Sequence, residues 1–176
     1  AAWKNASAGA TLHTTSKDEY FQRHIAPILH LEGDTLPVSA FQADGSVPTA
    51  TSKLEKHGAP LFLPKWIPQN CIQCNQCAFV CPHACIRPFL FSKDEETPQD
   101  FVTIPAMGVA EGKLRLQVYP HDCMGCGVCA NTCPAKQKAL VMTPTKDIFE
   151  EEALNYEYAQ KVTTIEAPFK GNTVKG

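Results

Sequence analysis

Apolar and polar residues alternate most regularly between positions 114 and 118. Leu114, Leu116 and Val118 are separated by Arg115 and Gln117. A period of two residues is typical of a β-strand with one face in the core and the other face toward water. We therefore expect a half-buried strand here, with its two polar side chains exposed.

Three further segments are rich in strand-forming residues. FVTIPA at 101–106 precedes LRLQVYP at 114–120, and the connecting MGVAEGK contains two glycines. Two strand candidates joined by a Gly-containing turn predict a β-hairpin. Short apolar runs at 87–91 (RPFLF) and 140–144 (LVMTP) predict two more strands.

The period changes to that of a helix after residue 16. Six residues fall roughly on one helical face: Tyr20, Phe21, His24, Ile25, Ile28 and Leu29. Ser16 followed by Glu19 fits a capping box at the start of this helix. Pro27 predicts a kink, and Gly33 predicts the end.

The remaining segments have weaker periodicity. Residues 34–69 contain many prolines and turn residues, so we expect an extended segment that packs on a partner surface. FEEEALNYEYAQKV at 149–162 predicts a helix in an acidic and polar tail. These segments suggest three parts: an N-terminal linker and extension at 1–69, a central domain at 70–144, and a C-terminal tail or linker at 145–176.

Composition excludes several classes of function. The chain has 176 residues, 44% of them hydrophobic, and a net charge of -2. No basic cluster suggests nucleic-acid binding, and no apolar run approaches the roughly 20 residues of a membrane span. The first residues lack an initiator Met and the apolar core of a secretory signal, so we expect a processed chain or a piece of a longer one.

Cysteine spacing carries the strongest chemical signal. Eight of the nine cysteines form two runs of the pattern C-x2-C-x2-C-x3-C-P: Cys71, Cys74, Cys77 and Cys81 before Pro82, and Cys123, Cys126, Cys129 and Cys133 before Pro134. This run is typical of bacterial ferredoxins, which bind [4Fe–4S] clusters. Three thiolates in a tight loop reach three corners of an iron–sulfur cube, and backbone N–H groups offset its negative charge. The sequence therefore predicts two [4Fe–4S] clusters.

The fourth cysteine of each run is predicted to begin a short helix, with the proline in its first turn. It would then face away from its own loop and ligate the cluster of the other run. Crossed ligation gives two sets: Cys71, Cys74, Cys77 and Cys133 for cluster one, and Cys123, Cys126, Cys129 and Cys81 for cluster two. The crossing would connect the two halves and bring the clusters close enough to exchange electrons.

Other interpretations of the cysteines fit the pattern less well. A disulfide framework conflicts with the odd count and the tight, regular spacing. Structural zinc pairs two C-x2-C knuckles and does not require the third cysteine or the proline. Residues 125–130 match a G-x-G-x-x-A nucleotide fingerprint, but no parallel β-α-β unit is predicted around them. Ligation requires reduced thiolates, which predicts a reducing intracellular compartment such as the cytoplasm or a mitochondrion-related organelle.

Loop shape is expected to differ between the two runs. Gly125 and Gly127 allow positive φ where the second loop turns, whereas the first loop has Gln73 and Asn75 at these positions. Asn tolerates positive φ, but Gln does so less well, so we expect the first loop to have another shape.

Several neighbours of the runs are assigned supporting roles. Ile72 and Met124 are expected to cover a cluster face, and Trp66 either shields a cluster or packs in the core. Cys85, the ninth cysteine, aligns with Ala139 if two residues are inserted in the second run. This alignment predicts a buried, inert thiol beside a cluster.

Four stretches together resemble the pyruvate:ferredoxin oxidoreductase and pyruvate:NADP oxidoreductase family: DTLPVSAFQADGSVPTATSKLEKHG, WIPQNCIQCNQCAFVCPHACIRP, DCMGCGVCANTCPAKQKALVM and LNYEYAQKV. The resemblance extends over about residues 16–176. It implies an α+β domain of the bacterial 2[4Fe–4S] ferredoxin type, with an inserted β-hairpin and a long N-terminal extension.

That family oxidises pyruvate on thiamine diphosphate to acetyl-CoA, and electrons leave through iron–sulfur clusters. The resemblance implies electron transfer through the eight cysteines, but no complete active site, since no thiamine diphosphate motif is found. The implied partners are other domains or subunits of a thiamine-dependent 2-oxo acid oxidoreductase, and a low-potential acceptor such as ferredoxin, flavodoxin or a flavoprotein domain. The alternative is an iron–sulfur subunit of another redox complex, with an electron-transfer or purely structural role.

Overall fold

The computed structural model describes residues 16–56 and 60–165. The chain divides into two compact units, Ala1–Gly58 and Ala59–Gly176. The predicted linker at 1–15 and the end of the predicted tail lie outside the described residues.

A short helix that changes from π-helical to α-helical geometry forms the centre of the first unit. Asp18 Oδ1 accepts a hydrogen bond from the Phe21 amide at 3.0 Å. Asp18 is therefore the N-cap, in place of the predicted Ser16. A π-helical turn, Phe21–Ile25, is followed directly by α1, Ala26–Leu29.

Pro27 lies in the first turn of α1, directly after this π-helical turn, and the kink predicted there stays a prediction. Proline has no N–H to donate to the carbonyl one turn earlier, and a wider turn before it accommodates the missing bond. The helix ends at Leu29 with His30 as its C-cap, and Leu31 follows in the left-handed conformation, with a φ of 63°. Glu32 N–H donates to Pro27 O at 2.8 Å and Leu31 N–H to Ile28 O at 3.1 Å, the two bonds of a Schellman motif. The end predicted at Gly33 was therefore wrong.

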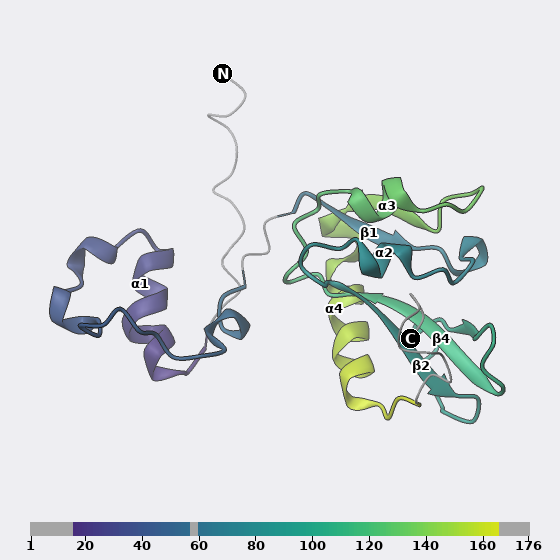
Figure 1. Ribbon diagram of the computed structural model, residues 1–176, viewed down its shortest axis with the longest axis horizontal. Coiled ribbons are helices and arrows are strands. Elements are labelled where there is room, and N and C mark those ends of the chain that lie inside the picture. The colour runs from purple at the N-terminus through teal and green to yellow at the C-terminus, as the bar shows by residue number, and fades with distance from the viewer. Residues whose placement is uncertain (1–15, 57–59, 166–176) are drawn as a thin grey trace, which may run out of the picture. The chain divides into compact units, whose positions relative to one another are not determined.

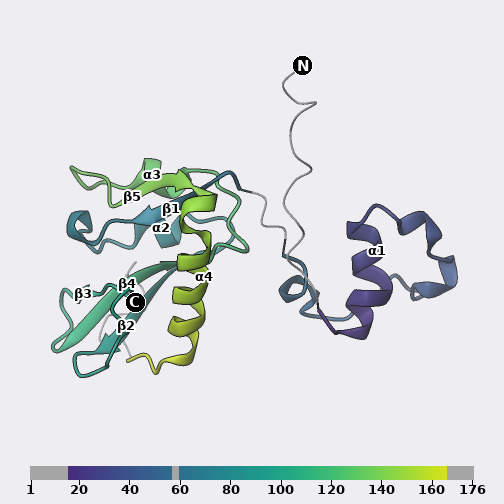
Figure 2. The same ribbon diagram turned by 180° about the vertical axis from the view of Figure 1, so that it is seen from behind.

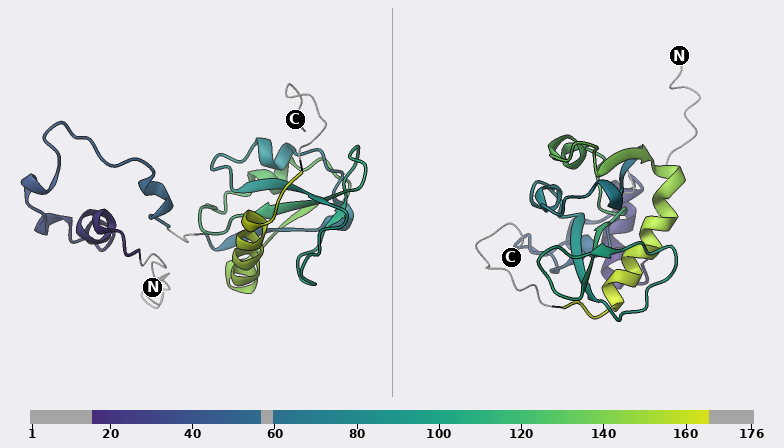
Figure 3. Two further views of the ribbon diagram at one scale, coloured as in Figure 1. Left: turned by 90° about the horizontal axis from the view of Figure 1, so that it is seen from below. Right: turned by 90° about the vertical axis from the view of Figure 1, so that its right-hand side faces the viewer.

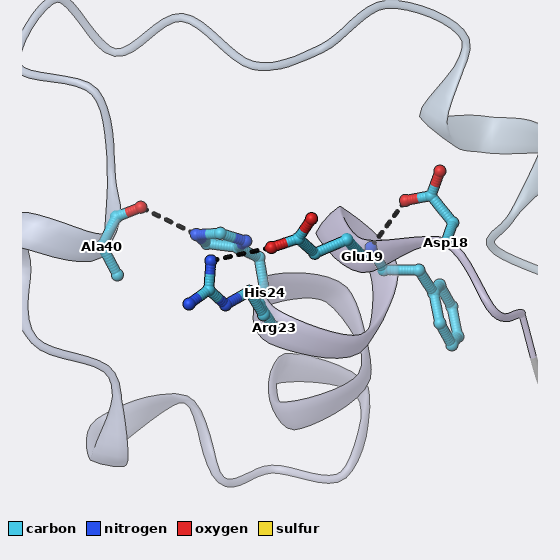
Figure 4. A network of polar contacts seen from close by, with 6 residues as sticks. Asp18, Glu19, Arg23, His24 and Ala40 are labelled. Atoms are coloured by element: carbon cyan, nitrogen blue, oxygen red, sulfur yellow. Dashed lines mark hydrogen bonds and ion pairs between the residues drawn. The ribbon is translucent and has the colours of Figure 1, made fainter.

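The rest of the first unit has little regular structure. Its short 3₁₀ turns are Gly33–Thr35, Val38–Ala40 and Thr51–Lys53. The ring of His24 stacks on the ring of Tyr20, with the two centroids 4.5 Å apart. His24 Nε2 lies 2.7 Å from the carbonyl oxygen of Ala40 (Figure 4). Among the described residues of this unit, Phe21 is the one fully buried hydrophobic side chain. The unit therefore has a very small core of its own.

Two small antiparallel sheets and a long helix form the second unit (Figures 1 and 2). The α+β class is as predicted. One sheet pairs β1 with β5, and the other has the order β2-β4-β3. The strands are β1 Phe62–Trp66, β2 Ile86–Ser92, β3 Ile104–Pro105, β4 Gly112–Val118 and β5 Leu140–Pro144. The helices are α2 Gln76–Phe79, α3 Val128–Thr132 and α4 Thr145–Lys161.

The two halves of this unit have the same order of elements, and each sheet pairs a strand of one half with a strand of the other. The order β1, cysteine loop, α2, β2 recurs as β4, cysteine loop, α3, β5. The first strand of each half pairs with the last strand of the other half, at Trp66 opposite Leu140 and at Val118 opposite Ile86. The repeated cysteine pattern is therefore a repeat of structure as well.

The structure confirms the strands predicted at 87–91 and 140–144, and the hairpin is present as β3 and β4. However, β3 has only two residues, and β2 is the longer partner of β4. The structure also divides the chain differently from the three predicted parts. β1, expected within the extension at 1–69, belongs to the second unit because it supplies one strand of a sheet, and α4 packs on this unit.

A buried polar network joins β4 to α4. This helix packs against β4, β1 and β5 and lies beside the sheets (Figure 3). Arg115 and Gln117, expected to face water, are 4% and 0% exposed. Gln117 Nε2 donates to Glu152 Oε2 at 2.5 Å, and Gln117 Oε1 accepts from Arg115 Nε at 2.6 Å. The Arg115 guanidinium also donates to Val102 O at 2.9 Å and lies 4.4 Å from the centre of the Phe101 ring.

The opposite face of β4 contributes to the main hydrophobic core. The apolar side chains of β4 pack in one cluster with residues of other elements, including two of the eight predicted ligand cysteines. The cluster consists of Trp66, Cys77, Ile86, Leu114, Leu116, Val118, Cys129 and Leu140. Both faces of β4 are thus covered. Within the described residues, no helix is long and apolar enough to cross a membrane.

Candidate iron–sulfur site

None of the nine cysteines, all of which lie within the described residues, forms a disulfide, and their burial varies. Cys77 and Cys129, the third of each run, lie within α2 and α3 and are buried. Cys126 is exposed, and the other predicted ligands are partly buried.

The fourth cysteine of each run does not begin a helix, contrary to the prediction. α2 ends at Phe79 before Cys81, and Cys133 is the C-terminal cap of α3, with ψ at 118°. The residue before a proline is disfavoured in the helical region, and proline cannot continue a helix. Each proline therefore follows the end of a helix that carries the third cysteine.

A cavity brings one cysteine of the first run to three of the second. Its lining includes Cys81 together with Cys123, Cys126 and Cys129. Proximity is also evident in the electrostatics, because Cys81 raises the pKa values of Cys123 and Cys129 after the larger effect of burial. This is the set predicted for cluster two.

The first loop brings together Cys71, Cys74 and Cys77. The pKa of the Cys77 thiol is raised to about 12, mainly by burial and to a smaller extent by Cys71 and Cys74. Assignment of Cys133 as the fourth ligand of this set stays a prediction.

The fourth cysteines have matching environments in the two halves. Cys85 N–H donates to Cys81 Sγ at 3.3 Å, and Ala139 N–H donates to Cys133 Sγ at 3.5 Å. Cys85 and Ala139 therefore occupy equivalent places, as their alignment predicted. Cys85 is 1% exposed, and burial raises its pKa to about 12.

The loops also share their left-handed residues. Gln73 and Asn75 have φ values of 56° and 58°, and Gly125 and Gly127 have values of 66° and 73°. The prediction that the first loop would differ in shape was wrong. Gln73 is held at this φ by contacts that the sequence did not reveal: its Nε2 donates to Pro105 O at 2.7 Å, and its Oε1 accepts from Met107 N–H at 2.8 Å.

These residues fit a four-iron cube. In the described part of the chain, no three His, Cys, Asp or Glu side chains converge as ligands of a single metal ion. A cube binds its four thiolates at separate corners, and the lining of the cavity includes the four cysteines predicted for cluster two. Backbone N–H groups donate to cysteine sulfur, as from Gly125 to Cys123 at 3.4 Å, which favours an anionic centre. Binding iron would displace protons from thiols whose pKa values burial has raised.

The predicted covering residues are only half buried. Ile72 and Met124 are 51% and 49% exposed, and Met124 lines the cavity beside Cys126. Trp66 is 6% exposed and belongs to the hydrophobic core that contains Cys77.

Substituting Gly125 with alanine is expected to damage the second loop more than substituting Gly127. Both glycines have positive φ, which costs an L-residue about 1–2 kcal/mol. A Cβ at Gly125 would also lie 2.7 Å from Phe62 O and 2.8 Å from Pro60 Cβ, whereas no atom lies within 4 Å at Gly127. We expect Gly125→Ala to retain less iron after reconstitution and to unfold at lower urea concentration than Gly127→Ala. Equal losses would show that backbone strain alone is responsible.

Comparison with known protein families supports this description. A family model described as a 4Fe-4S dicluster domain matches residues 70–137. A second model, EKR, a domain of unknown function, matches residues 10–59.

Curated relatives match nearly the whole chain. The pyruvate:ferredoxin oxidoreductase of Moorella thermoacetica is 46% identical over 100% of this chain, which corresponds to 15% of that protein. The chain is homologous to one segment of the pyruvate:ferredoxin (flavodoxin) oxidoreductase family. The mitochondrial pyruvate dehydrogenase [NADP(+)] of Euglena gracilis is 42% identical over 92% of this chain and 9% of its own length. The pyruvate-flavodoxin oxidoreductase of Enterobacter agglomerans is 46% identical over 86% of this chain and 13% of its own length.

The chain thus spans at most 15% of these three relatives. It carries a ferredoxin-like 4Fe–4S dicluster domain for two [4Fe–4S] clusters, as its cysteine pattern predicted.

Proposed function

We propose that this chain is the electron-transfer segment of a pyruvate:ferredoxin or pyruvate:NADP oxidoreductase. The observation that carries the proposal is the match along the full chain, which includes the first unit as well as the cysteine runs. A ferredoxin-like subunit of an unrelated redox complex would require only the second unit.

The ligand sets remain those of the crossed arrangement. Cluster two is assigned to Cys123, Cys126, Cys129 and Cys81, supported by their common cavity. Cluster one is assigned to Cys71, Cys74, Cys77 and Cys133, supported by the repeated plan of the two halves. When bound, each cluster supplies a centre that gains or loses one electron.

The chain's own residues would hold the two centres in fixed positions and restrict access of water. Exchange of strands between the halves fixes the two loops relative to each other. Burial of Cys77 and Cys129 in one hydrophobic cluster places protein of low polarity between the loops. A rigid, poorly hydrated medium reduces the reorganisation that accompanies each electron transfer.

The proposed partners are the remaining parts of a thiamine-dependent 2-oxo acid oxidoreductase and a low-potential acceptor such as ferredoxin, flavodoxin or a flavoprotein domain. The first unit supports attachment to a larger assembly, since it has a very small core and exposes several large apolar side chains: Ile28, Leu31, Val38, Phe41 and Val47. The proposed setting is a reducing intracellular compartment, in which the thiols remain available for iron.

Anaerobic reconstitution tests this function. The chain should bind about eight iron and eight labile sulfide ions, as expected for two cubes. Pyruvate and coenzyme A should then reduce the clusters only when the thiamine-binding remainder of a homologous oxidoreductase is added. Loss of visible absorbance and the appearance of an EPR signal would measure reduction.

Dithionite reduction of the isolated chain is the control for functional clusters. Reduction by dithionite but not by pyruvate with the added remainder would favour a subunit of another redox complex. Reduction by pyruvate without the remainder would reveal an active site in this chain and contradict the proposal. One zinc per cysteine set, with no sulfide, would exclude electron transfer.

A further inference from the structure

The two halves of the second unit differ most in the segment inserted between β2 and β4. This segment, residues 93–111, contains β3 and has no counterpart in the second half, where β5 is followed directly by α4. Its residues Ile104 and Ala106 pack against the hydrophobic cluster that includes Cys77. The insertion therefore reaches the hydrophobic cluster that contains a cysteine of each run.

One side chain of the first cysteine loop makes two hydrogen bonds to the backbone of the insertion. Gln73, between the first two cysteines of the run, is 6% exposed. Its amide nitrogen donates to Pro105 O at 2.7 Å, and its amide oxygen accepts from Met107 N–H at 2.8 Å. Both ends of the amide thus bind backbone groups on either side of Ala106.

The equivalent residue of the second loop is Gly125, which has no side chain to make such contacts. Gln73 keeps the left-handed φ that glycine adopts more easily. A loop that needed only this φ would be satisfied by glycine. The glutamine is therefore explained by its contacts with the insertion.

We propose that Gln73 is a positioning residue that holds the insertion against the first cysteine loop and thereby makes the environment of cluster one differ from that of cluster two. This inference rests on the proposed ligand sets. Excluding water from an anionic cluster disfavours the added negative charge of reduction. Held in this way, the insertion lowers the reduction potential of cluster one, whereas Pro60 and Phe62, and not an insertion, lie against the equivalent position of the second loop.

The test compares Gln73→Gly with Gln76→Ala in the full chain after anaerobic reconstitution. Glycine suits the left-handed φ, so Gln73→Gly removes the two hydrogen bonds without adding strain. Gln76 is an exposed glutamine on the same run and serves as the matched control. Gln73→Met is the second variant, because the uncharged thioether is similar in length but cannot donate to Pro105 O and is only a weak acceptor for Met107 N–H.

Redox titration monitored by EPR should show that one of the two potentials becomes less negative in Gln73→Gly, while the other remains at its wild-type value. Hydrogen exchange of the amides at 104–109 should become faster, and Gln76→Ala should change neither quantity. Gln73→Met should shift the same potential in the same direction, and it replaces Gln73→Gly as the test if the glycine variant does not fold.

Unchanged potentials in Gln73→Gly, or equal shifts of both potentials, would overturn the inference. Dithionite supplies the electrons in this titration, so the result does not depend on pyruvate. A failure of the proposed function in the pyruvate assay is therefore distinguishable from a failure of the role of Gln73.

Discussion

Replacing Cys81 with serine is expected to remove cluster two and to leave cluster one in place. Cys81 belongs to the first run but lines the same cavity as Cys126 of the second run. A serine hydroxyl is a poorer ligand than a thiolate for iron in a sulfur-bridged cluster. Iron content should fall by about half, from about eight to about four per chain.

Matched variants identify which cluster is lost. If the ligands cross, Cys81→Ser and Cys126→Ser should leave the same residual EPR spectrum, and Cys74→Ser should leave a different one. Agreement of Cys81→Ser with Cys74→Ser would show that the first run ligates its own cluster with all four cysteines.

Cys85→Ala is the control for a neighbouring thiol. Cys85 lines the same cavity, but its equivalent in the other half is Ala139, whose backbone N–H makes the same contact to the fourth cysteine. Alanine should therefore preserve the backbone bond to Cys81 and the full iron content. Loss of a cluster in this variant would contradict the prediction that this thiol is inert.

Sequence alone predicted the parts of the fold that depend on local pattern. The cysteine spacing predicted the dicluster domain, because cube geometry and tight loops restrict which spacings can bind. Alignment of the runs also paired Cys85 with Ala139, and the structure places them equivalently. The strand at 114–118 was found because its alternation of apolar and polar residues lies within the segment itself.

Non-local contacts account for what the sequence did not reveal. β1 contains a proline and lacks clear alternation, so its pairing with β5 could not be read from either segment. The sequence indicated that Gln73 would not suit a left-handed φ. The hydrogen bonds that hold it there are made with residues more than 30 positions later, which the local sequence does not reveal. Each of these features depends on a partner distant in the chain.

The polar face of β4 is the clearest example of such a long-range effect. Alternation correctly separated its two faces, but Arg115 and Gln117 face a helix rather than water. The buried face of α4 itself carries Glu152 and Asn155, so it gave little hydrophobic signal. Paired polar groups on two distant elements can be buried together when they satisfy one another.

Replacing Arg115 with methionine is therefore expected to destabilise the second unit by about 1–3 kcal/mol, because the buried acceptors Gln117 Oε1 and Val102 O lose their donor. Burial raises the pKa of the Glu152 carboxyl above its ordinary 4.5, and Arg115 and Gln117 partly oppose this effect. Methionine retains much of the packing volume but removes the cation and its donors. Urea unfolding measures the change, with the exposed Arg87→Met as control.

The pH dependence separates charge from packing. A raised folded pKa means that the native state binds more protons than the unfolded state, so stability falls as pH rises through the interval above 4.5. Arg115→Met should steepen this fall, because the cation that opposes the shift is gone. Glu152→Gln removes the titrating group and can still accept from Gln117, so the double variant should recover most of the loss at neutral pH. A double variant as unstable as Arg115→Met, with no change in its pH profile, would mean that Arg115 acts through its packing on Phe101 instead of through its charge.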